Sequence, residues 1–236
     1  MIASPSKIAL PLTHLRNALL GLSLLVSGLI QASDFSVKSI SKAAPSELGD
    51  SIKAELSDQA IQIFKGDKPL YELWLASSVT LNSAIDAPNR ALSALKQTTL
   101  LGAIKVIDSE RDYRDDELFD GTYTIRFGLR PDDGNHLGTS NFRYFAVLVA
   151  AKNDQELGGI TRSRQLVKAS SKTNPTDHPL ILSLFPVNSA EKAELEFHEP
   201  APEHTALRLS LAAKTADGAD AGFIVFDLVI DGMADF

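Results

Sequence analysis

The feature that most constrains the fold is a pair of strand-like segments, residues 121–129 and 142–151, joined by a polar loop. In the first segment, an apolar face that includes Tyr123 and Ile125 alternates with a polar face. This period of two residues is expected of a β-strand. The second segment is apolar on both faces after Arg143, which predicts a central strand covered on both sides. Together the two segments predict a hairpin at the centre of the fold.

Short apolar segments with turn formers between them continue along the rest of the chain. Helix is indicated only twice, over residues 89–96 and 162–169. With about eight or nine strands, we predict an all-β fold, a single antiparallel β-sandwich, in preference to a barrel or a βαβ fold. Seven residues at the centres of apolar strand faces are the predicted core: Tyr123, Ile125, Phe127, Leu148, Leu182, Leu209 and Phe226.

Three other features carry structural expectations. Trp74, the only tryptophan, is either a core or edge aromatic or a platform on which a sugar stacks. Gly102 interrupts a strand-like run, 98–107, which suggests a bulge or close backbone packing. Residues 108–120 are so rich in alternating charges that we expect a solvated loop whose ion pairs contribute little.

The first 32 residues have the layout of a secretory signal peptide. Lys7 and Arg16 precede an uncharged segment with an apolar centre that closes on Ala32. The apolar run is shorter than the ~20 residues that cross a bilayer, which favours cleavage, after Ala32 or Ser33, over a retained anchor. We therefore expect a periplasmic or secreted protein with no stable membrane insertion after cleavage. The predicted parts are a signal peptide (1–32), a loosely structured lead-in (33–59) and a β-sandwich domain (60–236).

Composition excludes several classes of site and partner. The chain has no cysteine, so it has no disulfide, no thiolate nucleophile or metal ligand, and no cysteine to carry a lipid. Loss of residues 1–32 would leave 21 of the 23 basic residues against all 30 acidic ones, a net charge of −9. This acidic balance argues against nucleic acid and anionic membrane surfaces as partners.

The loop between the two central segments concentrates polar groups. Asp132, Asp133, Asn135 and His136 offer oxygens and an imidazole, and Gly134 allows the sharp turn that a cation-binding loop requires. A divalent metal held here would use Asp133 and His136. Additional imidazole ligands would come from elsewhere: His178, His198 or His204. The alternative is a plain hairpin connection in which the Asp and Asn side chains accept hydrogen bonds from local backbone N–H groups.

Arginines and a serine flank this loop. Arg126, Arg130 and Arg143 suit a clamp for a carboxylate or phosphate, or ion pairs with the loop aspartates or with residues 108–120. Ser140 near His136 would be a hydrolase nucleophile, but no nucleophile-elbow sequence surrounds it, so we assign no catalytic residue. The candidate ligand-binding residues are Arg126, Asp132, Asp133, Asn135, His136, Ser140 and Arg143.

One stretch resembles a known group of proteins. It is similar to an uncharacterised family of exported bacterial proteins. The similar segments are Leu101 to Val106, Asp112-Tyr113-Arg114, Gly121 to Phe127 and Pro131 to Ser140, followed by Arg143. That family has a GxYTLRxxxxPxDGNHMGTSxxRDF core and a downstream HPxxLxL. This chain has Leu137 in place of Met and Tyr144 in place of Asp. The resemblance spans 101–184 and implies an exported β-rich domain, without carrying any catalytic residue over.

We therefore predict an exported, non-enzymatic binding or structural β-sandwich module. Its partner would be an unidentified ligand or a cell-envelope component, and nucleic acid is excluded by charge. The first alternative is an exported metal-binding protein that uses the loop from Asp132 to His136, with a divalent metal as its cofactor. A hydrolase is the remaining alternative.

Overall fold

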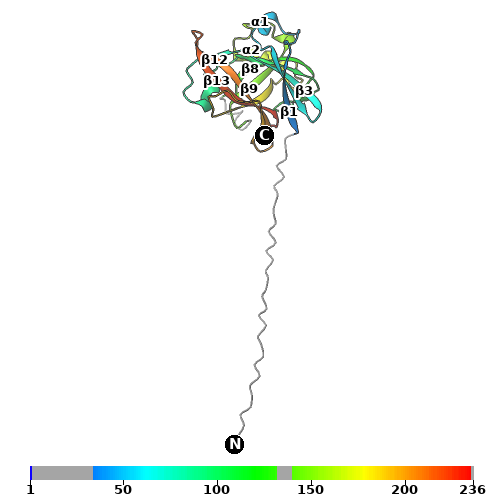
Figure 1. The fold of residues 1–236 in the computed structure, drawn as a ribbon. Helices are drawn as coiled ribbons and strands as arrows, with labels where there is room; N and C mark the ends of the chain where they lie inside the picture. The colour runs from blue at the N-terminus through cyan, green and yellow to red at the C-terminus, as the bar shows by residue number, and fades with distance from the viewer. Residues whose placement is uncertain (2–33, 132–139, 235–236) are drawn as a thin grey trace. The chain divides into compact units, whose positions relative to one another are not determined.

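The computed structural model describes residues 34–131 and 140–234, together with Met1, and strands dominate the described chain (Figure 1). The main sheet contains β1 (Phe35–Ser41), β2 (Gln59–Lys65), β3 (Lys68–Leu75), β4 (Val79–Thr80), β5 (Leu100–Val106), β8 (Gly121–Leu129), β9 (Tyr144–Ala150), β10 (Leu180–Pro186), β11 (Phe197–Ala201), β12 (His204–Lys214) and β13 (Asp220–Asp231). A second, two-stranded sheet contains β6 (Glu110–Arg111) and β7 (Glu117–Leu118). The helical elements are α1 (Asp50–Lys53), α2 (Ser163–Ser171) and the 3₁₀-helices η1 (Pro88–Ala94) and η2 (Ala151–Asn153). The predicted all-β, antiparallel class is confirmed.

The main sheet curves back on itself. Its strands follow the order β1-β2-β3-β5-β8-β9-β10-β13-β12-β11 in antiparallel pairs, and β4 adds a short parallel pair with β12. The rings of Phe35 in β1 and Phe197 in β11 lie 5.5 Å apart, so the two edge strands approach each other. Among the described residues these edges share no ladder. Two halves of one sheet thus face each other across a common core and form the layers of a sandwich without closing.

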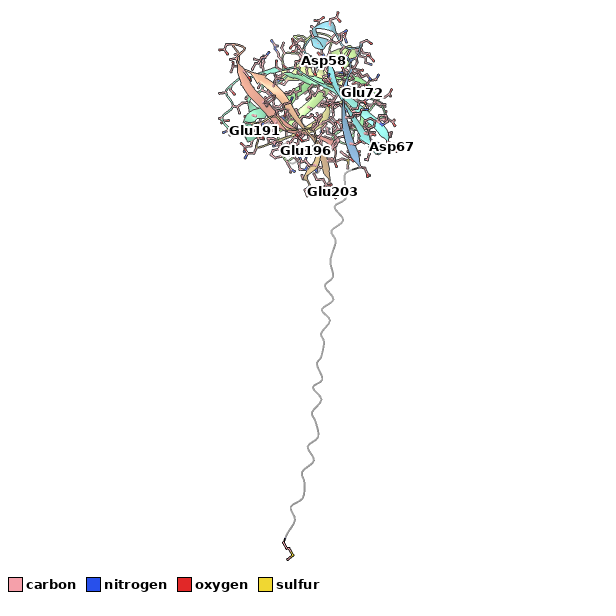
Figure 2. The ribbon with its side chains drawn as sticks, in the orientation of Figure 1. Asp58, Asp67, Glu72, Glu191, Glu196 and Glu203 are labelled. Carbon is pink, nitrogen blue, oxygen red and sulfur yellow. The ribbon has the colours of Figure 1, made fainter. Side chains whose placement is uncertain are left out.

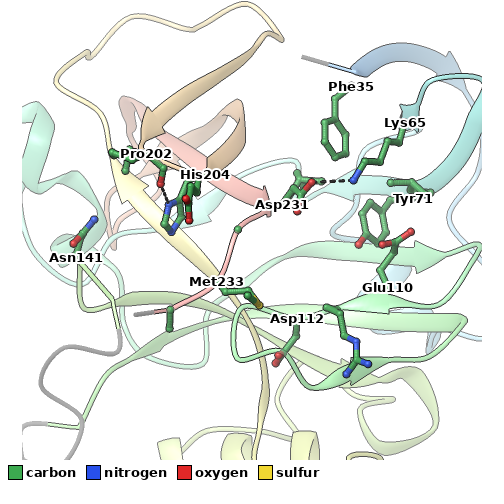
Figure 3. Close-up of a pocket in the computed structure, with 17 residues that line it drawn as sticks. Phe35, Lys65, Tyr71, Glu110, Asp112, Asn141, Pro202, His204, Asp231 and Met233 are labelled. Atoms are coloured by element: carbon green, nitrogen blue, oxygen red, sulfur yellow. Dashed lines mark hydrogen bonds and ion pairs between the residues drawn. The ribbon is translucent and has the colours of Figure 1, made fainter. Parts of the chain in front are cut away.

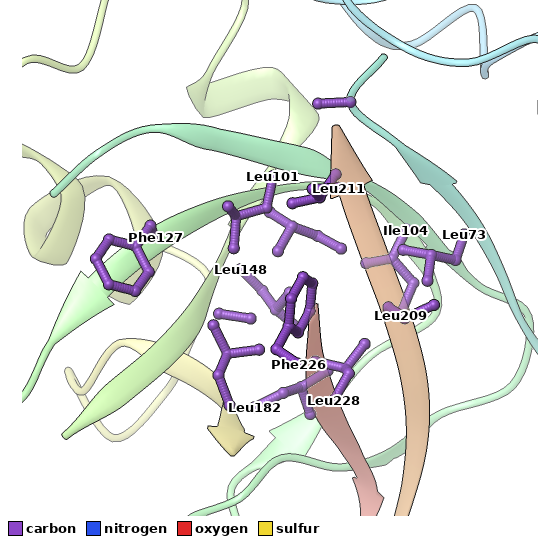
Figure 4. Close-up of a cluster of buried hydrophobic side chains, with 14 of the residues drawn as sticks. Leu73, Leu101, Ile104, Phe127, Leu148, Leu182, Leu209, Leu211, Phe226 and Leu228 are labelled. Atoms are coloured by element: carbon purple, nitrogen blue, oxygen red, sulfur yellow. The ribbon is translucent and has the colours of Figure 1, made fainter. Parts of the chain in front are cut away.

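The core fills the space inside this curved sheet. Leu148, Leu182, Leu209 and Phe226 meet there from β9, β10, β12 and β13, and Figure 4 shows them with their neighbours. All seven predicted core residues are buried, with at most 4% of their surface exposed. Burying an aliphatic or aromatic side chain of this size stabilises the fold by ~1.5–3 kcal/mol.

The predicted central hairpin is β8 and β9, with Ile125 opposite Leu148. β9 lies between β8 and β10, and its second face packs Val147 and Val149 into a separate cluster outside the curved sheet. α2 covers that cluster with Leu166 and Ala169. Coverage on both faces explains why this strand is apolar throughout. The second predicted helix is confirmed as α2, and the first is the 3₁₀-helix η1.

The predicted lead-in, residues 33–59, contains regular structure. β1 pairs with β2 over seven residue pairs, and α1 buries Ile52 completely. The cluster around α1 also takes in Trp74, which is fully buried and donates its Nε1–H to the carbonyl of Lys42 at 2.8 Å. A buried indole cannot stack on a sugar, so the core role of Trp74 holds.

The charged segment 108–120 is not the fully solvated loop that its sequence suggested. Asp112 and Tyr113 are buried, because this segment folds back against β10: the Tyr113 N–H donates to the carbonyl of Ile181 at 2.8 Å.

Among the described residues, no helix is both long and apolar enough to cross a bilayer.

Candidate functional site

Three of the seven predicted ligand-binding residues are described: Arg126, Ser140 and Arg143. The other four, and with them the predicted metal ligands, lie outside the described residues: Asp132, Asp133, Asn135 and His136. Within the described chain, no three His, Asp or Glu side chains form a group that would hold a metal ion.

Arg126 is buried beneath the surface of the fold. Its Nε and Nη2 donate to the two carboxylate oxygens of Asp154 at 2.6 and 2.9 Å, and its Nη1 donates to the carbonyl of Thr98 at 2.9 Å. The sequence suggested pairing with the loop aspartates or with segment 108–120, but the partner is Asp154, which directly follows η2. Only 2% of the surface of Arg126 is exposed, so its side chain is not accessible to a ligand. Its hydrogen bonds instead stabilise the outer face of β8.

Ser140 is also buried. Its hydroxyl lies 3.0 Å from that of Ser183 in β10 and accepts the N–H of Phe142 at 3.3 Å. Neither partner is a general base, and a serine nucleophile needs one within hydrogen-bond reach. The described contacts of Ser140 are those of a residue that anchors the start of the segment leading into β9.

Arg143 faces a different surface, which we call the α2 groove. It lies between α2 and the ends of β8, β9 and β10, with a volume of about 910 Å³. Its apolar lining comes from the end of β8, the outer face of β9 and β10, and the helix: Leu129, Phe145, Val147, Ile181, Leu166 and Val167. Its basic lining is Arg114, Arg130, Arg143, Arg164 and Lys168, and one acidic residue, Asp177, joins them.

Local hydrogen bonds fix α2 as one wall of the groove. The side chain of Gln165 accepts the N–H groups of Thr161 and Arg162 at 3.1 and 3.0 Å, which caps the helix start. Inside the helix, the Ser170 hydroxyl donates to the carbonyl of Leu148 at 2.6 Å and accepts the N–H of Leu180 at 2.9 Å. The helix is therefore tied to both β9 and β10.

The basic side chains of the groove differ in their partners. Arg114 lies 3.7 Å from the carboxylate of Asp116. Arg130 donates to the carbonyl of Ser140 at 3.2 Å, and its Nε is buried without a hydrogen-bond acceptor. Within the described residues, Arg130, Arg164 and Lys168 have no carboxylate within 4 Å. The described part of the groove thus presents cations beside an apolar wall.

A second cavity, of about 550 Å³, lies beside the β12–β13 ends (Figure 3). Two of the charged side chains that line it, Lys65 and Asp231, form a 3.0 Å ion pair. His204 lies 2.6 Å through Nδ1 from the carbonyl of Pro202 and 3.0 Å through Nε2 from the Tyr113 hydroxyl. A carbonyl only accepts, so Nδ1–H donates to it, and Nε2 shares a hydrogen bond with the tyrosine hydroxyl. Both ring nitrogens of His204 thus have hydrogen-bond partners within the protein.

The other two predicted imidazole partners lie in other surroundings. His198 is 2.7 Å from the carboxylate of Asp227, which also accepts from Arg208 at 3.0 Å. This hydrogen bond from Arg208 to Asp227 raises the pKa of the arginine. His178 lines the α2 groove. Each of the three histidines thus contacts a different set of residues.

Comparison with protein-family models, with curated proteins and with solved structures gives no match. The site is therefore defined by its own geometry.

The sequence contained a signal for the groove that the loop-centred prediction did not use. From Leu157 to Thr176 there are four basic residues and no acidic one, in a chain that is acidic as a whole. Two of them, Arg164 and Lys168, are four residues apart and so share one face of the predicted helix. What the sequence could not show is that Arg130 and Arg143 lie across from that face.

Proposed function

We propose that this chain is an exported, non-enzymatic binding module that takes a small ligand in the α2 groove. The predicted signal peptide supports export. The observation that carries the binding role is the groove itself, an apolar wall next to three cations, Arg130, Arg164 and Lys168, that have no described carboxylate partner. Its volume of about 910 Å³ matches that of typical small-molecule sites.

The absence of a paired nucleophile and base among the described groove residues supports binding without turnover. His178 and Asp177 line the groove, but among the described contacts their side chains form no hydrogen bond with each other. Arginine and lysine side chains stay charged at neutral pH and attract anions, whereas proton transfer needs groups that titrate near the working pH.

A thermal-shift screen tests the binding role. The protein, purified from cells, is screened against organic anions, sugars and neutral amphiphiles, because a ligand that binds only the folded state raises the melting temperature. The groove variant is Val167→Trp, which places an indole where the 45%-exposed valine now lines the groove. The matched control is Ile107→Trp, at an exposed aliphatic residue outside the groove.

We expect a ligand whose shift is present in wild type and in Ile107→Trp and is lost in Val167→Trp. Mass spectrometry after incubation should recover that ligand unchanged. A screen without any shift, or a shift that survives Val167→Trp, would overturn the groove as the binding site. Conversion of the ligand to a product would overturn the non-enzymatic role.

A further inference from the structure

The charges of the α2 groove contrast with those of the rest of the molecule. Acidic side chains are distributed over the folded part, among them Asp58, Asp67, Glu191 and Glu203, which are all exposed (Figure 2). Among the residues that the structure describes, the lining of the groove instead has five basic residues and one acidic residue. Such a local reversal of sign in a low-dielectric hollow concentrates anions.

The position of the cations on α2 has an energetic cost. Arg164 and Lys168 are one helical turn apart, and like charges at this spacing destabilise a helix by ~0.2–0.5 kcal/mol. Across the groove, the Nε of Arg130 is buried with no acceptor, which adds the desolvation cost of a donor left unsatisfied. A bound anion would offset both costs, since its oxygens accept from guanidinium and ammonium donors.

The apolar wall restricts what kind of anion fits. Phe145, Val147 and Ile181 come from the outer sheet face, and Val167 adds a side chain that is 45% exposed. Inorganic phosphate would leave the exposed part of this wall, which is mainly Val167, in contact with water. A neutral apolar molecule would leave the cations without a partner. Only a ligand that is anionic at one end and apolar at the other satisfies both parts of the groove.

We infer that the ligand of the α2 groove is an amphipathic anion, a single apolar chain or ring that carries a carboxylate or phosphate head group. This inference rests on the proposed function and adds the chemical class of the ligand. The head group would lie among Arg130, Arg164 and Lys168, and the apolar part would lie against Phe145, Val147 and Val167.

Isothermal titration calorimetry with four probes tests the ligand class. Dodecanoate and dodecyl phosphate carry the two head groups on the same chain, dodecyl maltoside carries that chain without charge, and inorganic phosphate carries charge without a chain. All amphiphiles are used below their micelle-forming concentrations. We expect dodecanoate, dodecyl phosphate or both to bind one per protein, and the tighter of the two identifies the head group. Dodecyl maltoside and inorganic phosphate should bind at least about tenfold more weakly.

Two charge variants give the matched comparison. Arg164→Gln with Lys168→Gln removes two cations that line the groove. Arg162→Gln with Lys172→Gln removes two exposed cations that flank the same helix but do not line the groove. The first pair should weaken binding of the anionic amphiphile by about tenfold or more and flatten its salt dependence. The second pair should change binding by less than about twofold, and circular dichroism should show both variants folded.

Four outcomes would overturn the inference. Equal binding of dodecyl maltoside would show that the charge is not recognised, and equal losses in the two variant pairs would show an effect of net charge alone. Binding to phosphatidylglycerol vesicles without binding of any monomeric probe would assign the surface to a membrane. A neutral ligand whose thermal shift is lost in Val167→Trp would refute the anionic class while the proposed binding function stands.

Discussion

The ion pair of Arg126 and Asp154 is buried between β8 and the turn after β9, with side chains that are 2% and 0% exposed. Removing one partner leaves the other charge buried. Asp154→Ala should therefore reduce the free energy of unfolding by ~3–5 kcal/mol. Replacing both residues by apolar ones of similar size, Arg126→Met with Asp154→Leu, should cost less than the single change. Urea denaturation measures both, and a single-variant loss below about 1 kcal/mol would contradict the expectation.

Asp112 gives stability a dependence on pH. Its carboxylate accepts the N–H groups of Arg114, Asp116 and Ile181 at 2.8, 3.0 and 2.9 Å. Burial, the largest cause, raises its pKa to about 6 from 3.8 despite those bonds, and the charge of Asp116 adds to the rise. The folded state thus keeps a proton that the unfolded state loses above pH 3.8. The contribution of this group to stability is fully present below about pH 4 and is lost as pH rises through about 6.

The measurement compares wild type with Asp112→Asn, which cannot ionise. Between pH 4 and 6.5, the unfolding free energy of wild type should fall relative to that of the variant by ~1–3 kcal/mol. The absolute stability of Asp112→Asn should be lower at both pH values, because its amide nitrogen cannot accept the Ile181 N–H. Curves that run parallel across this range would show that Asp112 does not titrate there.

Single residues were predicted well where the signal is local. The seven core residues stand at the centres of alternating strand faces, and burial follows directly from that alternation. Asp112 was not predicted because its partner Ile181 is 69 residues away in the chain. Asp154, the partner of Arg126, is separated from it by 28 residues and was missed for the same reason.

At the scale of elements, β5 depends on a glycine. Its register with β8 shifts between Leu100 and Gly102, and a Cβ at Gly102 would lie 2.3 Å from the carbonyl oxygen of Trp74. The predicted bulge or close packing at this residue is thus confirmed. Because backbone cannot move away easily, Gly102→Ala should destabilise the fold by ~1–3 kcal/mol.

The control for that substitution is Gly158→Ala, since a Cβ there would have no heavy atom within 4 Å. We expect its unfolding midpoint in urea to stay near the wild-type value. A Gly102→Ala midpoint equal to that of Gly158→Ala would show that β5 and β3 can separate without cost.

Strand and helix assignments followed from periodicity wherever an element was long. β8 alternates, β9 is apolar throughout, and α2 has an apolar face, so each was predicted at nearly its observed place. β1 was not predicted because it is an edge strand, in which Phe35 and Val37 are half-buried and most other side chains are exposed. α1 is only four residues long, too short for a helical period to show.

At the scale of the whole molecule, the sequence could not predict which strands are neighbours. β10 pairs with β13, and β1 reaches β11 through the contact of Phe35 with Phe197. These neighbours are far apart in sequence, and their order is decided by how the two halves of the sheet bury a common core. The α2 groove depends on the same arrangement, because its two walls meet only when α2 lies on the outer face of β9 and β10.

The proposed export can be tested at the start of the mature protein. β1 begins at Phe35, so the proposed cleavage after Ala32 or Ser33 would leave this strand and its full ladder with β2 in the mature chain. Intact-mass measurement of the protein from the cell-envelope or secreted fraction should give an N-terminus at Ser33 or Asp34.

Signal peptidases need a small residue before the cut, so Ala32→Phe should leave uncleaved precursor or move the cut to a neighbouring site. For the cut after Ala32, the control Gln31→Phe should be processed as in wild type, because residue 31 is neither the first nor the third residue before that cut. A mature wild-type protein that retains Met1 would contradict the proposed export by cleavage.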